Sequence, residues 1–113
     1  MSESCLFCRI ARKEIPAGIV AETDGFLALR DIDPKAPFHV LIVPKAHVAS
    51  LNDVKDAKLL GEMMRFAVSV AEDNGYAKSG YRTVINTNAD GGQTVFHLHL
   101  HLLAGRRLGW PPG

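Results

Sequence analysis

Three histidines alternate with leucines near the end of this 113-residue chain, in the run His97-Leu98-His99-Leu100-His101-Leu102. Successive side chains of an extended strand point to opposite faces, so the histidines would share one face and the leucines the other. A rise of about 3.3 Å per residue would set neighbouring imidazoles about 6.6–7 Å apart along the strand. This spacing favours three imidazoles with different partners over three bonded to one another, and we expect the leucine face to pack into the core.

A histidine row of this kind could carry out nucleophilic chemistry at phosphorus. Histidine has an unperturbed pKa of about 6.5, so its imidazole is mostly neutral at physiological pH and is a competent nucleophile. Its attack would divide one hard hydrolysis into two easier displacements. The preceding segment Asp90-Gly91-Gly92-Gln93-Thr94 offers backbone N–H groups, an amide and a hydroxyl as donors to phosphoryl oxygens. Together the two segments indicate group transfer through a histidine.

Two other interpretations of the histidines are an exposed polar face and a hydrolytic zinc site. The chain has five histidines, and the other two, His39 and His47, flank one further strand. Pairing of that strand with the last would gather all five histidines in one place. A hydrolytic zinc would need another carboxylate or histidine ligand and a general base, and the sequence places no acidic residue near the triad. These points favour the nucleophile.

The composition is typical of a single folded domain. Hydrophobic residues make up 47% and charged residues 22%, and the formal net charge is +1. No basic tract or one-sided charge block predicts a nucleic-acid partner or an anionic membrane surface. No apolar run approaches the roughly 20 residues that span a bilayer, and the first residues lack the pattern of a secretion signal. We therefore expect a cytoplasmic protein, and at this size pairing with a second copy would bury more surface.

Short strands and one long helix must position these groups. Asp-Gly at 24–25 is typical of a hairpin turn, and apolar residues recur at three- and four-residue spacing before Gly75, as in a helix that ends there. The expected elements are one or two helical turns in 4–12 with Ser4 as N-cap, strands at 19–22 and 26–30, a loop at 31–37, a strand at 39–43 that Pro44 ends, a helix from Asp53 to about Asn74, a strand at 81–86, a glycine-rich loop at 88–93 and a strand at 95–103. We therefore predict an α+β fold, with a mostly antiparallel sheet and one long helix packed on it.

These residues resemble the histidine triad (HIT) family, whose signature is His-φ-His-φ-His-φ-φ with φ apolar, and within it the Hint branch of purine nucleoside phosphoramidases. The resemblance covers essentially the whole chain as one HIT domain, residues 1–113. Its Gly-Gly-Gln lead-in to the triad is specific, and the closing Trp110-Pro111-Pro112-Gly113 points to the Hint branch rather than to the dinucleoside polyphosphate hydrolases. Further matching segments are Phe7 to Ile10, 13–16, 31–34, Ala36-Pro37 with His39, 43–45 with His47, Asn86, 91–95 and Gly105-Arg106.

The resemblance implies an activity and an assembly. A HIT-like two-layer sandwich would dimerise into a continuous sheet, and the homodimer would cleave the P–N bond of purine nucleoside 5′-phosphoramidates (AMP-amines) through a covalent nucleotidyl-histidine intermediate. No organic cofactor is implied. The alternatives are hydrolysis of dinucleoside polyphosphates by the same chemistry, a nucleotide-binding regulatory module, and a small zinc-stabilised interaction domain. The last would leave His99 and His101 unexplained.

The resemblance also implies a role for individual residues. His99 would be the nucleophile, His101 would contact the phosphate and help the leaving group, and His39 would orient the nucleophile; with His97 these form the catalytic set. Asp31 would hydrogen-bond the ribose hydroxyls, a role that suits its two acceptor oxygens. Leu6, Phe7, Ile10, Leu29 and Ile32 would wall the base pocket, and Asn86, Gly92, Gln93 and Thr94 would line the phosphate end with His99 and His101. Arg30 departs from the Hint branch, which often carries histidine at this position beside the base. The resemblance therefore leaves the base preference of this protein open.

The only two cysteines form the motif Cys5-x-x-Cys8. Taken alone, the motif allows half of a zinc site, a redox pair or two thiols without a special role. Some bacterial members of the family use the equivalents of Cys5, Cys8, His47 and His97 to bind zinc, a Cys2His2 set of the kind that structural zinc prefers. The resemblance thus implies a structural zinc. The alternative is that both cysteines line the base pocket as small apolar side chains.

Overall fold

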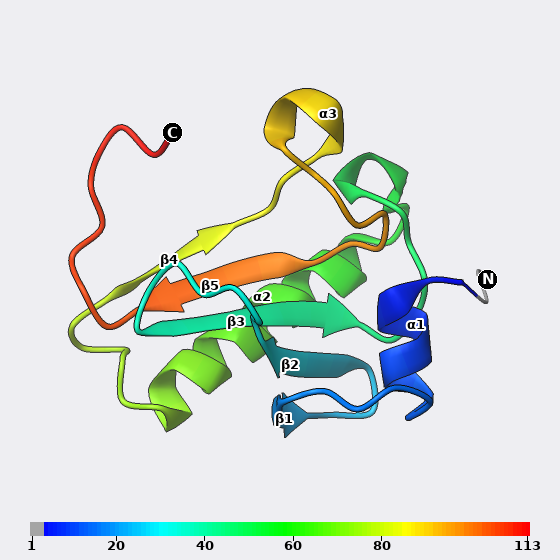
Figure 1. The fold of residues 1–113 in the computed structure, drawn as a ribbon, viewed down its shortest axis with the longest axis horizontal. Helices are drawn as coiled ribbons and strands as arrows, with labels where there is room; N and C mark the ends of the chain where they lie inside the picture. The colour runs from blue at the N-terminus through cyan, green and yellow to red at the C-terminus, as the bar shows by residue number, and fades with distance from the viewer. Residues whose placement is uncertain (1–3) are drawn as a thin grey trace.

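The computed structural model describes residues 4–113 and shows an antiparallel sheet with a long helix across one face (Figure 1). The sheet has five strands in the order β1-β2-β3-β5-β4, and each neighbouring pair is antiparallel. Its strands are β1 (Ile19–Glu22), β2 (Phe26–Arg30), β3 (Phe38–Pro44), β4 (Tyr81–Val84) and β5 (Leu100–Ala104). The predicted α+β class and antiparallel sheet are confirmed.

The long helix α2 (Ala57–Asp73) begins later than the sequence predicts. Asp56 is its N-cap, and the Asp56 side chain accepts a hydrogen bond from the backbone N–H of Lys58. The residues Leu51–Asp53 instead form a separate 3₁₀ turn, η1. The prediction of a start at Asp53 is therefore wrong, because a better cap lies three residues further on. The predicted end is close, since Gly75 follows the helix with a left-handed φ of +86°.

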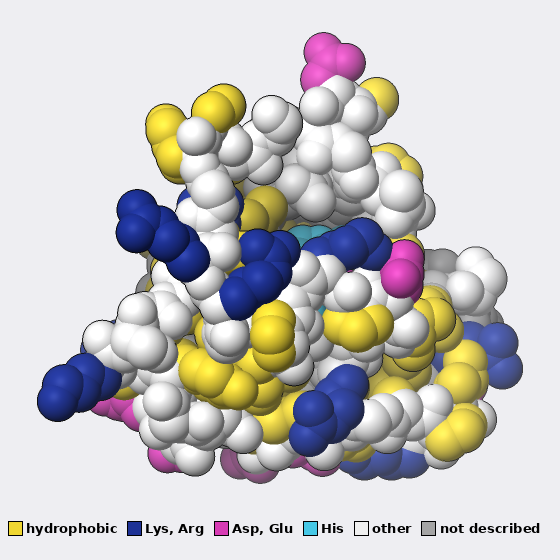
Figure 2. Space-filling model, turned by 60° about the vertical axis from the view of Figure 1, so that its left-hand side comes forward, with side chains coloured by type: hydrophobic (Ala, Val, Ile, Leu, Met, Phe, Trp, Pro, Cys, Tyr) yellow, Lys and Arg dark blue, Asp and Glu magenta, His cyan; other side chains and the backbone are white. Residues whose placement is uncertain are grey.

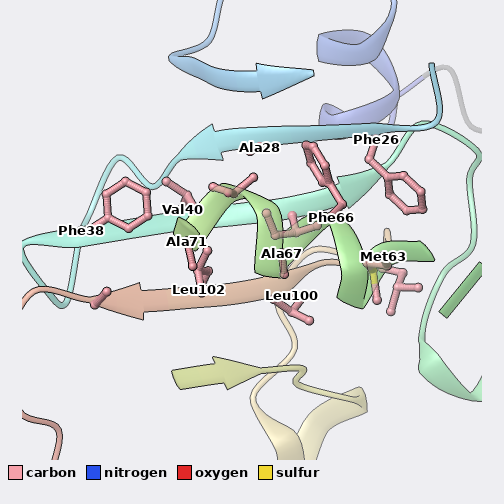
Figure 3. Packing of buried hydrophobic residues seen from close by; sticks show 14 residues of the cluster. Phe26, Ala28, Phe38, Val40, Met63, Phe66, Ala67, Ala71, Leu100 and Leu102 are labelled. Carbon is pink, nitrogen blue, oxygen red and sulfur yellow. The ribbon is translucent and has the colours of Figure 1, made fainter. Parts of the chain in front are cut away.

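The main core lies between α2 and one face of the sheet, and its residues come from alternate positions of the three central strands (Figure 3). Leu98, Leu100 and Leu102 belong to this core, as the leucine alternation predicts. The other positions of β3 and β5, which include His39 and His101, therefore face away from α2. The helix α2 therefore covers one face of the sheet, and the histidine side chains lie on the other face.

A second, smaller cluster lies on that opposite face beneath α1 (Leu6–Ala11). Phe7 and Ile10 of α1 pack there against Leu27, Leu29 and Val43. The N-cap of α1 is Cys5, whose sulfur accepts a hydrogen bond from the Cys8 N–H. The prediction of Ser4 as N-cap is wrong by one residue, and the cysteine motif itself begins the helix.

Several predicted boundaries also shift near the histidines. The last strand, predicted at 95–103, is limited to Leu100–Ala104, and β4 ends at Val84 rather than Asn86. The predicted loop 88–93 contains a single helical turn, α3 (Asn88–Gly91). Within residues 4–113, no helix combines the length and apolar character needed to cross a membrane.

Candidate active site

The histidine run keeps its alternation although only His101 lies on a paired strand. His97 and His99 precede β5 and are buried, whereas Leu98 between them packs into the main core. The Leu98 N–H donates to the carbonyl of Val48, outside the sheet ladder. An extended backbone is sufficient for side chains to alternate, so the faces were predicted correctly even where the strand was not.

His99 has a defined tautomer. Its Nδ1 atom lies 2.7 Å from the backbone carbonyl oxygen of His97. A carbonyl can only accept a hydrogen bond, so Nδ1 of His99 carries a hydrogen, and in the neutral ring Nε2 keeps its lone pair. The ring packs edge-on against Phe7 and His101, with centroids 5.2 Å away in each case. These contacts hold the ring, and in its neutral form Nε2 presents the lone pair that a nucleophile requires.

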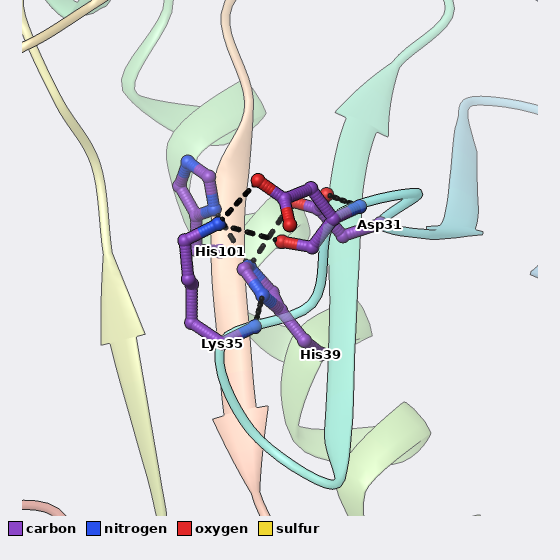
Figure 4. Close-up of polar contacts among 5 residues, drawn as sticks. Asp31, Lys35, His39 and His101 are labelled. Carbon is purple, nitrogen blue, oxygen red and sulfur yellow. Dashed lines mark hydrogen bonds and ion pairs between the residues drawn. The ribbon is translucent and has the colours of Figure 1, made fainter.

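His39 and His101 form a second fixed unit (Figure 4). The backbone N–H of Lys35 donates to Nδ1 of His39 over 3.0 Å, so the His39 hydrogen is on Nε2. That Nε2 lies 2.9 Å from Nδ1 of His101, which must then accept. In its neutral form His101 consequently carries its own hydrogen on Nε2, as a donor directed away from His39.

Asp31 stands beside this pair, with one carboxylate oxygen 3.3 Å from Nε2 of His39. The expectation that no acidic residue lies near the triad is therefore wrong, because Asp31 follows β2 directly and its N–H donates to the carbonyl of His39 over 3.0 Å. Asp31, His39 and His101 each offer an atom, and these atoms lie within 4.8 Å of one another. The other Asp31 oxygen accepts from the Asp33 N–H over 2.8 Å.

The environment keeps these imidazoles neutral. Burial, together with the neighbouring His99 and His39, lowers the pKa of His101 to about 4 against the opposing effect of Asp31. Burial also lowers the pKa of His39, more than Asp31 raises it. The contact between Asp31 and His39 thus joins a carboxylate to a neutral ring rather than to an imidazolium.

An open cavity of about 340 Å³ adjoins the His39–His101 pair. Asn86, one of the predicted phosphate-end residues, lines it together with Asp31 and Lys35. In the space-filling view a histidine is visible in a hollow between Lys and Arg side chains (Figure 2), a surrounding that suits an anionic ligand. A larger cavity of about 810 Å³ lies between α2 and the β1–β2 turn, away from the histidines and cysteines.

The predicted base-pocket residues fall into two groups. Phe7, Ile10 and Leu29 are buried together in the smaller cluster, whereas Leu6 and Ile32 are exposed. Phe7 also connects this cluster to the site, because its ring contacts those of His97 and His99 edge-on.

The predicted phosphate-end residues differ in exposure and in whether their polar groups are already hydrogen-bonded within the protein. The Gln93 side chain is buried and occupied: its oxygen accepts from the Asn88 N–H, and its NH2 donates to the carbonyls of Ala49 and Val95. Thr94 and Gly92 are exposed, and Gly92 has a left-handed φ of +85°. In this structure Gln93 therefore shapes the segment before the histidines rather than offering its amide to a ligand.

Cys5, Cys8, His47 and His97 converge, with one potential ligand atom from each within 4.8 Å of all the others. Nδ1 of His97 lies 3.2 Å from Sγ of Cys5, 3.6 Å from Sγ of Cys8 and 3.1 Å from Nδ1 of His47. Zn–N bonds of about 2.0–2.1 Å and Zn–S bonds of about 2.3 Å imply tetrahedral edges of about 3.3–3.6 Å between such ligands. The donor set and its spacing fit a zinc ion.

A backbone carbonyl fixes the tautomer of His97 that could bind zinc through Nδ1. Its Nε2 lies 2.7 Å from the carbonyl oxygen of Pro44, so Nε2 carries the hydrogen and Nδ1 presents a lone pair to the sulfurs. Burial lowers the pKa of His97 and raises the pKa of the Cys8 thiol, so zinc would bind a ready imidazole but would have to displace a thiol proton. When bound there, zinc would supply a closed structural cross-link.

Sequence analysis did not identify three backbone groups that orient the histidines, one of which is the His97 carbonyl beside His99. The Lys35 N–H fixes the tautomer of His39, and the Pro44 carbonyl fixes that of His97. No residue-type pattern could have marked them, because every residue has a carbonyl and every residue but proline an N–H.

Known proteins are similar to this chain in fold and in sequence. Residues 12–108 match the family described as HIT domain. The purine nucleoside phosphoramidase of Escherichia coli K12 is 47% identical over 111 residues, which cover 96% of this chain and 93% of that protein. The crystal structure of a HIT family hydrolase from Legionella pneumophila superposes with a TM-score of 0.94 at 52% identity, covering 97% of this chain and all (100%) of that one. A histidine triad protein from Clostridium difficile gives a TM-score of 0.93 at 40% identity, covering 96% of each chain.

These matches extend over nearly the full chain. The protein belongs to the HIT domain family of hydrolases.

Proposed function

We propose that this protein hydrolyses the P–N bond of purine nucleoside 5′-phosphoramidates through a nucleotidyl intermediate on His99. The observation that carries the proposal is the tautomer of His99: Nδ1 is held 2.7 Å from the His97 carbonyl, which leaves Nε2 free to attack. The phosphoramidase name of the 47% identical relative supports the substrate class.

In the first step Nε2 of His99 forms a bond to phosphorus while the P–N bond breaks, and the departing nitrogen takes the electron pair. That nitrogen accepts a hydrogen bond from Nε2–H of His101, takes a proton from a water molecule and leaves as a free amine. His99 carries a positive charge while it is bonded to phosphorus, and the hydroxide formed from that water balances it. In the second step the hydroxide attacks phosphorus, the bond between phosphorus and Nε2 breaks with its electron pair returning to His99, and the nucleoside monophosphate leaves.

The remaining contacts assign roles on the same hypothesis. Asp31 binds the ribose hydroxyls, Asn86 and Thr94 line the phosphate end, and Phe7, Ile10 and Leu29 form the floor of the base pocket. Asp31 already lies beside His39, so one carboxylate would serve both the ribose and the histidine pair.

The decisive experiment compares AMP release from an AMP-amine with AMP release from diadenosine polyphosphates. We expect kcat/KM to favour the AMP-amine by about 100-fold or more, which corresponds to about 2.7 kcal/mol of differential transition-state binding. The opposite preference would assign the protein to dinucleoside polyphosphates instead. Binding without turnover of either compound would support a regulatory nucleotide-binding module.

Two properties of the assembly belong to the same proposal. The Cys5–Cys8–His47–His97 cluster would hold one structural zinc per chain, as the fit of its ligand distances supports. A homodimer would form through β4, which ends the strand order and pairs only with β5 within the chain. Sedimentation across micromolar concentrations should reveal the dimer, and a monomer at every concentration would contradict it.

A further inference from the structure

The loop between β2 and β3 is fastened to the end of β5 by two contacts. The Arg106 guanidinium donates through Nη2 to the carbonyl of Lys35 over 2.8 Å. At Gly105, where φ is +99°, an added Cβ would lie 2.8 Å from Cβ of Pro37, so the close approach of the two segments depends on glycine. Neither contact involves a histidine, yet both hold the loop that carries Lys35.

Lys35 connects this fastening to the histidines. Its carbonyl accepts from Arg106, and its N–H donates to Nδ1 of His39. If Lys35 moved away, His39 could carry its hydrogen on Nδ1 instead. Nε2 of His39 would then be an acceptor, and Nδ1 of His101, only 2.9 Å away, would have to donate. His101 would in that case lose the hydrogen on Nε2 that the proposed reaction uses.

We propose that Arg106 is a positioning residue: through Lys35 it selects the tautomer of His39 and thereby keeps the Nε2 hydrogen of His101. This inference rests on the proposed function for its kinetic consequence, whereas the tautomers themselves are properties of the free protein. A second guanidinium nitrogen, Nη1, donates to the carbonyl of Arg107 over 3.1 Å, so two backbone carbonyls orient the side chain.

Direct contact between Arg106 and substrate is the competing role. Arg106 lines a cavity of about 530 Å³ that shares Val84, Asn86 and Leu103 with the cavity beside His101. A substrate contact would affect the binding of the anionic ligand, and hence KM, whereas tautomer selection would affect mainly kcat. The two roles are therefore separable by kinetics.

The experiment uses Arg106→Ala and Arg106→Lys, with Arg107→Ala as a matched control that removes an adjacent exposed arginine of equal charge. We expect Arg106→Ala to lower kcat for an AMP-amine by about 10- to 100-fold, the effect of a small misplacement of a catalytic group, with little change in KM. Arg106→Lys can still donate to the Lys35 carbonyl and should recover part of kcat. Arg107→Ala should match the parent protein.

Nitrogen-15 NMR of the imidazoles gives a readout that needs no substrate. The free parent protein should show His39 and His101 as single Nε2–H tautomers, and Arg106→Ala should shift both towards a mixture, whereas Arg107→Ala should not. Gly105→Ala, which reaches the same loop through Pro37, should act in the same direction, and thermal melting would verify that each variant is folded.

Unchanged tautomers in folded Arg106→Ala would overturn the proposal, and so would a loss confined to KM. If the parent protein does not hydrolyse AMP-amines, the proposed function fails while the NMR comparison still tests the role of Arg106.

Discussion

The backbone carbonyl oxygen of His97 lies 2.7 Å from Nδ1 of His99, so a residue of the Cys/His cluster orients the next histidine along the chain. The side chain of His97 faces Cys5, Cys8 and His47, and its main chain faces the proposed nucleophile. The candidate metal cluster and the proposed reaction centre are therefore neighbours that share one residue but use different atoms of it.

Removal of zinc should consequently lower stability more than it affects chemistry. Cys8→Ser removes one ligand, and we expect loss of the metal and a fall in Tm of about 10 °C or more. The His97 carbonyl remains in place while the chain is folded, so kcat below the new Tm should fall by less than about tenfold. Elemental analysis, melting and single-turnover assays would check this, with the exposed Ser79 changed to Ala as a control. Loss of activity in Cys8→Ser without a change in Tm would instead indicate a catalytic metal.

His99→Ala should abolish the covalent intermediate. Because the ribose and base contacts remain, nucleotide binding should persist while kcat falls by about 10⁴-fold or more. Intact mass spectrometry under alkaline quench would detect a nucleotidyl adduct on the parent protein and none on the variant. An adduct on His97 or His101 with His99 unmodified would contradict the assignment.

Asp31→Asn should weaken ribonucleotides more than their 2′,3′-dideoxy analogues. Loss of a charge-assisted acceptor costs about 1.5–3 kcal/mol, or about 10- to 100-fold in affinity. Both classes should also lose some kcat, because Asp31 lies 3.3 Å from His39. Titration calorimetry with paired nucleotides would separate the two effects. Equal losses in affinity would show that Asp31 does not bind the ribose.

Acidification should destabilise the protein partly through His101. Its pKa falls from 6.5 to about 4 on folding, because the ring is buried and close to His99 and His39. Between these values the unfolded chain binds more protons at this residue than the folded chain, so stability rises with pH. The contribution is fully present above pH 6.5 and is lost as the pH falls towards about 4.

His101→Gln tests this, because glutamine does not titrate. Urea unfolding at about pH 7 and about pH 5 should show a smaller difference for the variant than for the parent protein. His39 and His97, whose pKa values are also lowered, should retain the rest of the slope. An unchanged slope would mean that His101 titrates normally in the fold.

Local patterns predicted much of the sheet but not where its pairing stops. The β1–β2 hairpin is confirmed at both strands, because Asp-Gly chemistry and strand propensity agree there. The last strand was overextended, since its β3 partners end at the pair Ile42 and Leu100. Alternation of histidine and leucine reports burial on two faces and carries no information about the partner strand.

In the candidate site, the side chains could be predicted from the sequence, whereas the backbone groups that orient them could not. Residue types and the family signature predicted that the histidines and cysteines would lie together, and the fold does bring His39 to His101 and His47 close to His97. Tautomers depend on the Lys35 N–H and the carbonyls of Pro44 and His97, whose positions follow from the folded loops. Asp31 was missed as a neighbour of the triad because the approach is made across the fold rather than along the chain.

The contact between Cys5 and His97 joins residues 92 positions apart. During synthesis on the ribosome, Cys5 and Cys8 emerge early. Almost the whole chain must be made before His97 can join them. His97, the last candidate ligand, and His99, the proposed nucleophile, emerge two residues apart. A chain interrupted before His97 would therefore lack both the complete Cys/His cluster and the proposed nucleophile, while it would already contain both cysteines.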